Sequence, residues 1–297
     1  PIQSHSLREL YIRKAKTDAR DSLIIADLVR FGRCKASNVP QDKILALREL
    51  CRSRSYLIDT AADLKRKLIA LLDRIFPEYE SLFDPVFGKA SIAVLRKYPT
   101  PQKIKNAHLG KLTELLMESS GGHFGEWKAR QLKEAAQNSF GIDDSCGVYS
   151  TLLGMFLEQI LSLTDQADSL EKQIASLLKE FDSQLTSIPG IGTVLAAMIL
   201  SEIGNISRFS SSDKLLAYAG LDPSVKQSGE FSSNQNRMSK RGSPYLRRAI
   251  WLASTVAVQC DPMFQAYYEK KTSEGLHYMN VIGHVSRKMT AVIFAVL

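Results

Sequence analysis

The stretch YSTLLGMFLEQILSLTDQADSLEKQIASLLKEF, residues 149–181, decides how we expect this chain to fold. Its apolar residues recur at alternating steps of four and three, from Tyr149 to Phe181. That spacing draws one apolar seam along a helix, and a seam that lasts four or more heptads favours a coiled coil. A helix of an ordinary bundle is the alternative interpretation.

A second seam lies earlier in the chain. The same alternation runs from Leu47 to Ile75, is interrupted by Arg54 and ends before Pro77. Because the two predicted helices have similar lengths, they could pair as an antiparallel hairpin within one chain or pair across a dimer. Between them, residues 77–145 predict a helical insert of shorter helices.

Outside the seams the pattern is also helical. Residues 6–12 predict a short strand or loop, and a helix follows from about Thr17 to Phe31, capped by Thr17 or Asp18 and ended by Gly32. After about residue 184 we expect an apolar helix, another capped helix, a polar serine-rich stretch over 224–239, and two helices over about 243–258 and 262–297. The predicted fold class is therefore mainly α.

Composition narrows the class of protein. The chain has 297 residues, of which 44% are hydrophobic and 24% charged, so it suits a soluble globular protein of two or three domains. A net charge of +8 favours a polyanionic partner, with nucleic acid before an anionic membrane. No run approaches the roughly 18 apolar residues of a membrane span. Four cysteines without C-x-x-C spacing fit a reducing cytoplasm.

Both ends of the sequence lack the signals that usually mark the start and the end of a protein chain. The chain opens at Pro1 rather than at methionine and stops inside an amphipathic apolar pattern. We therefore expect it to be a piece of a longer protein.

Two aspartates lie three residues apart in KAKTDARDS, residues 14–22. Asp18 and Asp21 share one face of the predicted helix and could bind a divalent cation, Mg²⁺ first, because that hard ion prefers carboxylate oxygens. Two-metal sites for phosphoryl transfer need about three or four carboxylates. The alternative is a pair of acids that stabilise the positive end of the helix dipole.

The stretch IPGIG, residues 188–192, resembles the turn of a helix-hairpin-helix unit. Pro189, Gly190 and Gly192 would let backbone amides approach a phosphate without reading bases. A plain tight turn between packed helices is the alternative.

A basic run follows in RMSKRGSPYLRR, residues 237–248, which holds five positive charges and no acid. Such a run predicts contact with nucleic-acid phosphates. The five residues are Arg237, Lys240, Arg241, Arg247 and Arg248.

Just before the basic run, Ser228 is followed by Gly229 in a polar loop that could present the serine hydroxyl to an electrophile. Serine is a weak nucleophile unless a base, a metal or a nearby cation activates it. A plain flexible loop is the alternative, and other serines compete for the role: Ser224, Ser232, Ser233, Ser239 and Ser243.

Read together, three stretches resemble a known family: residues 14–32, residues 188–223 and residues 227–254. The family is the group of insertion-sequence transposases related to the Piv-type DNA invertases, which are bridge-RNA-guided serine recombinases. The central seams resemble the coiled-coil linker of that family. The resemblance thus covers nearly the whole chain.

The resemblance implies roles for particular residues. Asp18 and Asp21 match the last two carboxylates of a RuvC-like DEDD site that binds Mg²⁺, whose first two acids would precede Pro1. Ser228 matches the serine that becomes covalently linked to DNA. The resemblance also implies a noncoding guide RNA, two DNA partners, a homodimer that can pair into a tetramer, and a cytoplasmic location in a prokaryote, at the nucleoid when acting.

The domains that we expect are a RuvC-like remnant over 1–40, a coiled-coil linker with its helical insert over 41–183, and a C-terminal transposase domain over 184–297. The function that we expect is that of a DNA recombinase, with the chain as given too incomplete to be active. A non-catalytic DNA- or RNA-binding scaffold and a metal nuclease without a covalent intermediate are the alternatives.

Overall fold

The computed structural model describes residues 17–32, 42–223, 227–228, 231–232 and 238–297. By their contacts, residues 1–41 and 42–297 form two separate groups. In the first group the structure describes one helix, α2 (Asp18–Arg30). Thr17 caps it, because its side chain accepts a hydrogen bond from the Arg20 amide, and Gly32 follows its end with a φ of +62°. The predicted strand or loop over 6–12 lies outside the described residues.

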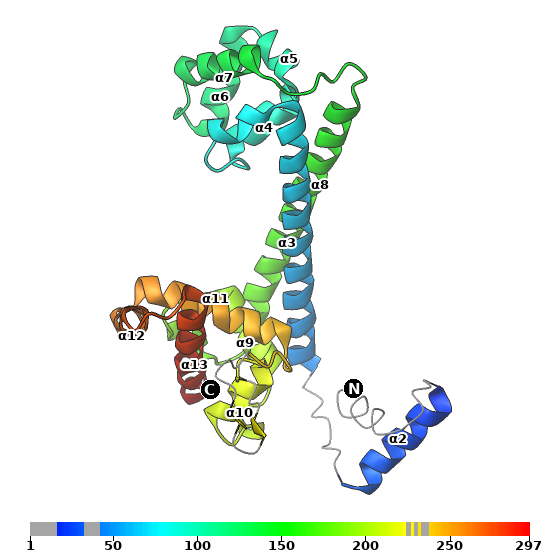
Figure 1. The fold of residues 1–297 in the computed structure, drawn as a ribbon, viewed down its shortest axis with the longest axis vertical. Coiled ribbons are helices and arrows are strands. Elements are labelled where there is room, and N and C mark those ends of the chain that lie inside the picture. Colours follow the sequence, from blue (N-terminus) through cyan, green and yellow to red (C-terminus); the bar gives the residue numbers. More distant parts are fainter. Residues whose placement is uncertain (1–16, 33–41, 224–226, 229–230, 233–237) are drawn as a thin grey trace. The chain divides into compact units, whose positions relative to one another are not determined.

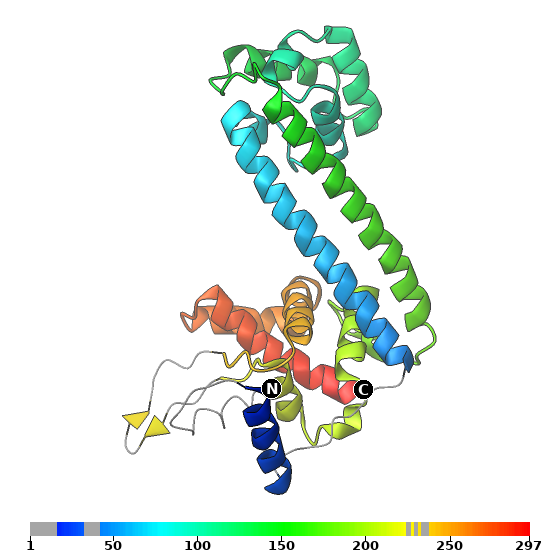
Figure 2. The same ribbon diagram turned by 90° about the vertical axis from the view of Figure 1, so that its right-hand side faces the viewer.

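Two long helices form the stem of the second group. The helix α3 (Asp42–Ile75) packs antiparallel along α8 (Val148–Leu178), as Figures 1 and 2 show. The seams meet within the chain, with Leu68 of α3 and Ile160 of α8 almost fully buried. Arg54, which interrupts the first seam, donates two hydrogen bonds at 2.7 and 3.1 Å to Glu171 of α8.

The predicted helical insert lies at one end of the stem (Figure 1). Thr100 and Pro101 take the N-cap and first positions of α5, as their sequence predicts. Tyr79 is the largest side chain fully buried in this part. The elements are η1 (Pro77–Leu82), α4 (Lys89–Lys97), α5 (Pro101–Lys105), α6 (Leu109–Ser120) and α7 (Glu126–Asn138).

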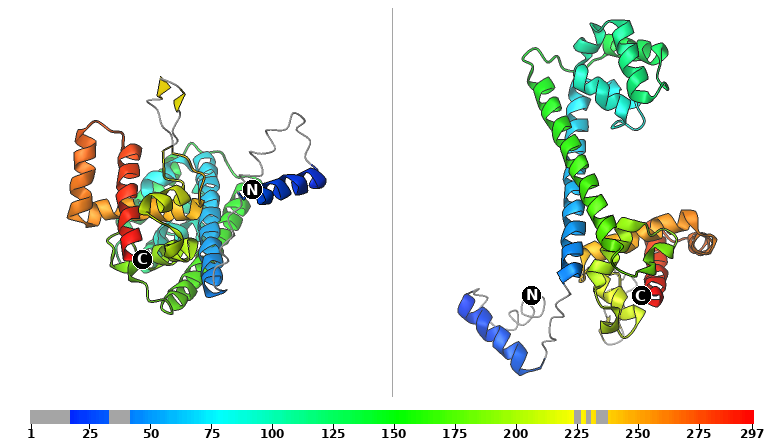
Figure 3. Two further views of the ribbon diagram at one scale, coloured as in Figure 1. Left: turned by 90° about the horizontal axis from the view of Figure 1, so that it is seen from below. Right: turned by 180° about the vertical axis from the view of Figure 1, so that it is seen from behind.

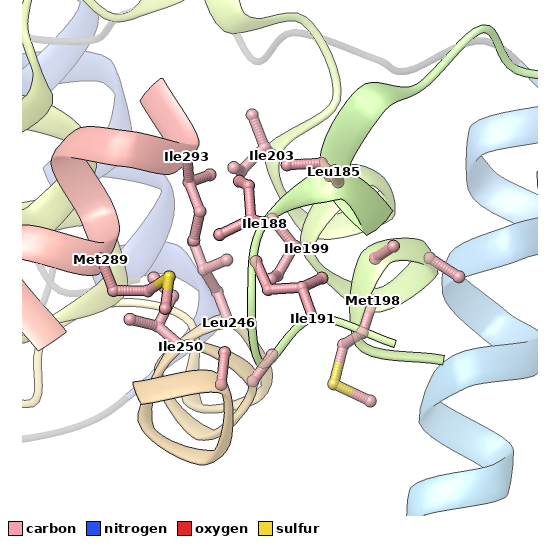
Figure 4. Close-up of a cluster of buried hydrophobic side chains, with 14 of the residues drawn as sticks. Leu185, Ile188, Ile191, Met198, Ile199, Ile203, Leu246, Ile250, Met289 and Ile293 are labelled. Atoms are coloured by element: carbon pink, nitrogen blue, oxygen red, sulfur yellow. The ribbon is translucent and has the colours of Figure 1, made fainter. Parts of the chain in front are cut away.

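The other end of the stem carries the C-terminal helices. Their core gathers Ile188, Ile199, Leu246, Ile250 and Ile293, which point toward one another in Figure 4. The helices α11, α12 and α13 pack pairwise (Figure 3). The elements are η2 (Gln184–Ser187), α9 (Thr193–Ile203), η3 (Ile206–Arg208), α10 (Ser212–Ala219), α11 (Pro244–Cys260), α12 (Pro262–Ser273) and α13 (Tyr278–Val296).

The prediction of a mainly α fold is confirmed, while the single helix expected over 262–297 is wrong. The chain turns between α12 and α13, where Gly275 has a φ of +80° and the His277 side chain caps α13. The only strands among the described residues are β1 (Gln227–Ser228) and β2 (Phe231–Ser232), an antiparallel pair. None of the described helices has the length and apolar character needed to cross a membrane.

Candidate functional site

The two aspartates of the candidate metal site lie in the first turn of α2. Asp18 is exposed and Asp21 is half-buried. The described residues contain no group of three or more histidines, cysteines, aspartates or glutamates that could hold a metal ion. Asp18 and Asp21 thus supply two carboxylates at the start of α2, of the kind that hard cations prefer as ligands.

The turn at residues 188–192 packs into the protein on one side. Gly190 has a φ of +87°, and a Cβ on it would lie 2.4 Å from the Ala253 carbonyl oxygen of α11. Ile188 and Ile191 are buried, whereas Pro189 and Gly192 are exposed. Helix packing thus accounts for Gly190. The element before the turn is the four-residue 3₁₀ helix η2, shorter than the first helix of a helix-hairpin-helix unit.

A tightly packed pair of segments follows, which we call the loop base: residues 220–223 after α10 and residues 238–243 before α11. Backbone amides of Ser239, Lys240 and Ser243 donate to the carbonyls of Asp222, Gly220 and Tyr218 at 2.8, 3.0 and 2.9 Å. An isolated β-bridge joins Pro223 to Met238. The loop base thus holds together the two ends of the serine-rich segment 224–237.

Glycine is required where the two segments of the loop base touch. A Cβ on Gly242 would lie 1.8 Å from the Tyr218 carbonyl oxygen, and one on Gly220 would lie 2.7 Å from the Gly242 nitrogen. Among described residues other than glycine, only Lys240 has a positive φ, of 52°. At Lys240 the backbone of the basic run therefore takes an unusual conformation, which the surrounding loop base holds.

The five predicted basic residues divide by their surroundings. Lys240 and Arg241 are exposed on the loop base. Arg247 donates to the Ala219 carbonyl at 3.1 Å, and Arg248 pairs with Asp59 of α3 at 2.6 Å. Arg237 lies outside the described residues. Lys240 and Arg241 are the members of the run, within the described part, for which no structural hydrogen bond of the side chain is found.

Ser228 lies at the end of β1, where its backbone pairs with Phe231. Two of the competing serines have structural roles. The Ser239 hydroxyl donates to the Asp222 carboxylate, and the Ser243 hydroxyl caps α11 by accepting from the Leu246 amide at 3.2 Å. Ser224 and Ser233 lie outside the described residues.

The sequence did not predict the polar centre next to the loop base. Glu202 of α9 is 2% exposed, and Arg52 of α3 donates to its two oxygens at 2.7 and 3.0 Å. The Ser243 hydroxyl donates to the same carboxylate at 2.8 Å. Hydrogen bonding to Glu202 raises the pKa of Arg52. The stem and the cap of α11 therefore meet at one buried carboxylate.

One sequence signal could have pointed to this centre. In LAAMILSEIG, residues 195–204, Glu202 is the only charged residue of an otherwise apolar helix. A buried carboxylate needs a cation partner, and Arg52 lies 150 residues earlier in the chain. The pattern could predict the need for a partner but could not identify it.

Comparisons with known proteins match both ends of the chain. Residues 1–77 match a family model described as a transposase, DEDD_Tnp_IS110. Residues 182–269 match the model of the transposase IS116/IS110/IS902 family. The second match spans the turn at 188–192, the loop base and Ser228.

Similar proteins cover almost the whole chain. An uncharacterized 43.6 kDa protein of the insertion element IS110 from Streptomyces coelicolor is 26% identical over 298 residues, 98% of this chain and 73% of that protein. A 44.8 kDa protein of IS116 from Streptomyces clavuligerus is 28% identical over 97% of this chain and 72% of its own length.

The name of a third relative describes the inversion of a gene. The pilin gene-inverting protein of Moraxella bovis is 31% identical over 147 residues, 47% of this chain and 46% of that protein. Two transposase family models match at the two ends of the chain and insertion-element proteins match along nearly all of its length, so the chain is similar to the IS110/IS116 family of transposases over almost its whole extent.

Proposed function

We propose that this protein cuts and rejoins DNA through a covalent bond between Ser228 and a DNA phosphate. The observation that carries the proposal is the loop base. It holds both ends of the segment that contains Ser228 and exposes Lys240 and Arg241 beside them. A serine on a short hairpin can attack a phosphodiester whose charge is offset by cations, and the loop base supplies two cations at the ends of this segment.

The proposed attack of Ser228 on DNA needs no external energy source. The Ser228 oxygen forms a new bond to phosphorus, and one phosphorus–oxygen bond to a deoxyribose breaks. The serine proton leaves to a base or to water, and the departing sugar oxygen accepts a proton. Because one ester replaces another, a sugar hydroxyl of a second strand can later displace Ser228 and rejoin the DNA.

The choice of Ser228 is supported by the roles of its competitors. Ser239 and Ser243 are engaged in hydrogen bonds that hold the loop base and cap α11. Either hydroxyl would have to leave those bonds in order to attack DNA. Ser228 precedes a glycine, and among the described residues its backbone pairs with the short strand β2.

Asp18 and Asp21 would contribute oxygen ligands to a Mg²⁺ ion, and further ligands would have to come from other groups. When bound, the ion would polarise a phosphodiester and offset its negative charge. The exposed position of Asp18 and the match of residues 1–77 to the DEDD model support this part of the proposal.

Lys240 and Arg241 would bind the DNA backbone, as Pro189 and Gly192 would through the exposed side of the turn at 188–192. We also propose that a noncoding RNA guides target choice and that the protein acts as a dimer or tetramer of identical chains. Location in a prokaryotic cytoplasm belongs to the same proposal. The RNA and the oligomer rest on the resemblance of the sequence to RNA-guided recombinases.

One assay distinguishes the proposed recombinase from the two alternatives, a metal nuclease and a non-catalytic scaffold. The intact protein, with the acids expected before Pro1, is incubated with DNA of its element ends, target DNA, the element's noncoding RNA and Mg²⁺, and strand cleavage and joining are followed. Ser228→Ala is expected to abolish both, whereas Ser232→Ala is expected to keep both. Cleavage that persists in Ser228→Ala would indicate a metal nuclease. Binding without any cleavage in the unaltered protein would indicate a scaffold.

A further inference from the structure

A cavity of about 370 Å³ lies beside the loop base. Its lining comes from α10, from α13 with Leu276 just before it, and from Leu221, Pro223 and Met238 of the loop base. The volume falls in the range of about 300–1,000 Å³ that is usual for small-ligand pockets. The cavity is therefore next to the two ends of the serine-rich segment but is built from other residues.

One glycine in the cavity wall has no structural reason to be a glycine. Gly283 lies inside α13 with helical backbone, and a Cβ on it would meet nothing within 4 Å. Glycine inside a helix costs about 1 kcal/mol relative to alanine. Neither backbone conformation nor packing within the described residues requires it. What the glycine does provide is open space on the cavity side of α13.

The chemistry of the lining fits a planar heterocycle attached to a phosphate. Met238 and Met279 offer polarisable thioethers, which make favourable contacts with aromatic rings. Asn280 and His284 bring hydrogen-bonding groups that can meet the edge of a base.

Arg287 at the cavity can meet the phosphate. It pairs with Asp213 at 2.9 Å, and the two side chains are 60% and 67% exposed. Such an exposed pair contributes little stability, so a phosphate can replace the carboxylate at small cost. Lys240 and Arg241 on the neighbouring loop base add positive charge for the adjoining backbone.

We propose that this cavity binds one unstacked nucleotide of a single strand, with the base against Met238 and Met279 and the phosphate at Arg287. The inference rests on the proposed function only in taking a nucleic-acid strand as the ligand. It extends the nucleic-acid surface to α13, where the sequence predicted no binding residue. Holding one base would fix the register of the strand next to the segment that carries Ser228.

The proposal is tested by filling the cavity with a larger side chain. Gly283→Leu places a side chain in the open space, and Gly154→Leu is the matched control, because Gly154 lies inside α8 with equally open space around it and outside this cavity. Both changes are made in Ser228→Ala without metal, so that no bond chemistry enters. Fluorescence anisotropy then measures binding of short single-stranded DNA, single-stranded RNA of the same sequence, and the DNA backbone with abasic sites.

Gly283→Leu is expected to weaken binding of the base-carrying strand about tenfold, the effect of losing one stacked base, and to leave the affinity for abasic DNA unchanged. Gly154→Leu is expected to change neither. The DNA and RNA arms show which strand the cavity prefers. The proposal would be overturned if Gly283→Leu and its parent bound every strand with equal affinity. It would also be overturned if the substitution changed only the oligomeric mass of the protein.

A second measurement covers the case in which Gly283→Leu does not fold. Single-stranded DNA carrying 5-iodouracil is photocrosslinked to the protein without a change at Gly283, and the linked peptides are identified. The expected crosslinks fall on Met238, Met279 or His284. Crosslinks only to other helices would contradict the inference. Neither measurement needs the serine reaction. Both can therefore be interpreted even if the proposed recombinase chemistry fails.

Discussion

Arg52 of the stem and Glu202 of the C-terminal helices form a two-bond ion pair whose carboxylate is 2% exposed. Arg52 also lies over the ring of Tyr245, 4.9 Å from its centroid, and Ser243 donates to the same carboxylate. The pair thus connects the coiled-coil stem to the first turn of α11, directly after the loop base. The position of the basic run depends on the stem through this contact.

Removal of Arg52 should strongly destabilise the protein. Arg52→Met leaves the Glu202 carboxylate buried without its cation, which typically costs about 3–5 kcal/mol. We expect the lower end of that range, because the Arg52 side chain is 37% exposed and water can partly replace it. The free energy of unfolding in urea checks this. The matched control is Arg130→Met, which removes an exposed pair with Glu126 and should cost less than about 0.5 kcal/mol. Equal losses would contradict the importance of the buried pair.

Stability should fall at alkaline pH because of Cys51. Burial raises the pKa of its thiol from 9.0 to about 12, so the unfolded chain loses this proton at lower pH than the native protein. The contribution is complete below pH 9 and is lost as the pH rises toward 12. It amounts to roughly 1 kcal/mol between pH 8 and pH 10. Urea titrations of the protein and of Cys51→Val at these two pH values should differ by that amount. Parallel pH dependence in both would contradict the prediction.

Gly190→Ala should cost more than Gly275→Ala. Both glycines have positive φ, of +87° and +80°, so each substitution carries the strain of a left-handed alanine, about 1 kcal/mol. Only at Gly190 would the new Cβ also strike the backbone of α11, whereas it meets nothing within 4 Å at Gly275. Thermal unfolding should show a larger drop in Tm for Gly190→Ala. A larger drop for Gly275→Ala would contradict the packing of the turn against α11.

The exposed cations of the loop base should contribute to DNA binding through phosphates. Lys240→Ala combined with Arg241→Ala should weaken binding at low salt for any sequence. It should also reduce the slope of log affinity against log salt by about 1.8, because each neutralised phosphate contributes about 0.9 to that slope. Lys172→Ala combined with Lys179→Ala, two exposed lysines on and directly after α8, removes the same charge and serves as the control. An equal effect of both pairs would indicate a general charge effect only.

The features predicted from sequence were those fixed by neighbouring residues. The two seams, the caps at Thr17 and Thr100, and the mainly α class depend on spacing and on local hydrogen bonds. The break between α12 and α13 was missed although two signals mark it: residues 269–275, EKKTSEG, contain no apolar residue, and Gly275 can end a helix. Local pattern thus predicts elements well and their interruptions less well.

The candidate site depended more on contacts between distant segments. Glu202 needs Arg52, 150 residues earlier, and Gly190 needs the backbone of α11. The same contacts divided the basic run, since Arg247 and Arg248 bind Ala219 and Asp59. Such partners meet only in the folded chain, so composition alone gave all five cations the same role.

The most direct test of the account is to locate the protein–DNA bond. The intact protein is incubated with DNA of its element ends, the noncoding RNA and Mg²⁺. It is then denatured and digested, and the peptide that carries a nucleotide is sequenced by mass spectrometry. The account predicts a nucleotide esterified to Ser228 and none in Ser228→Ala. A nucleotide on Ser224, Ser232 or Ser233, or cleaved DNA without any linked peptide, would contradict it.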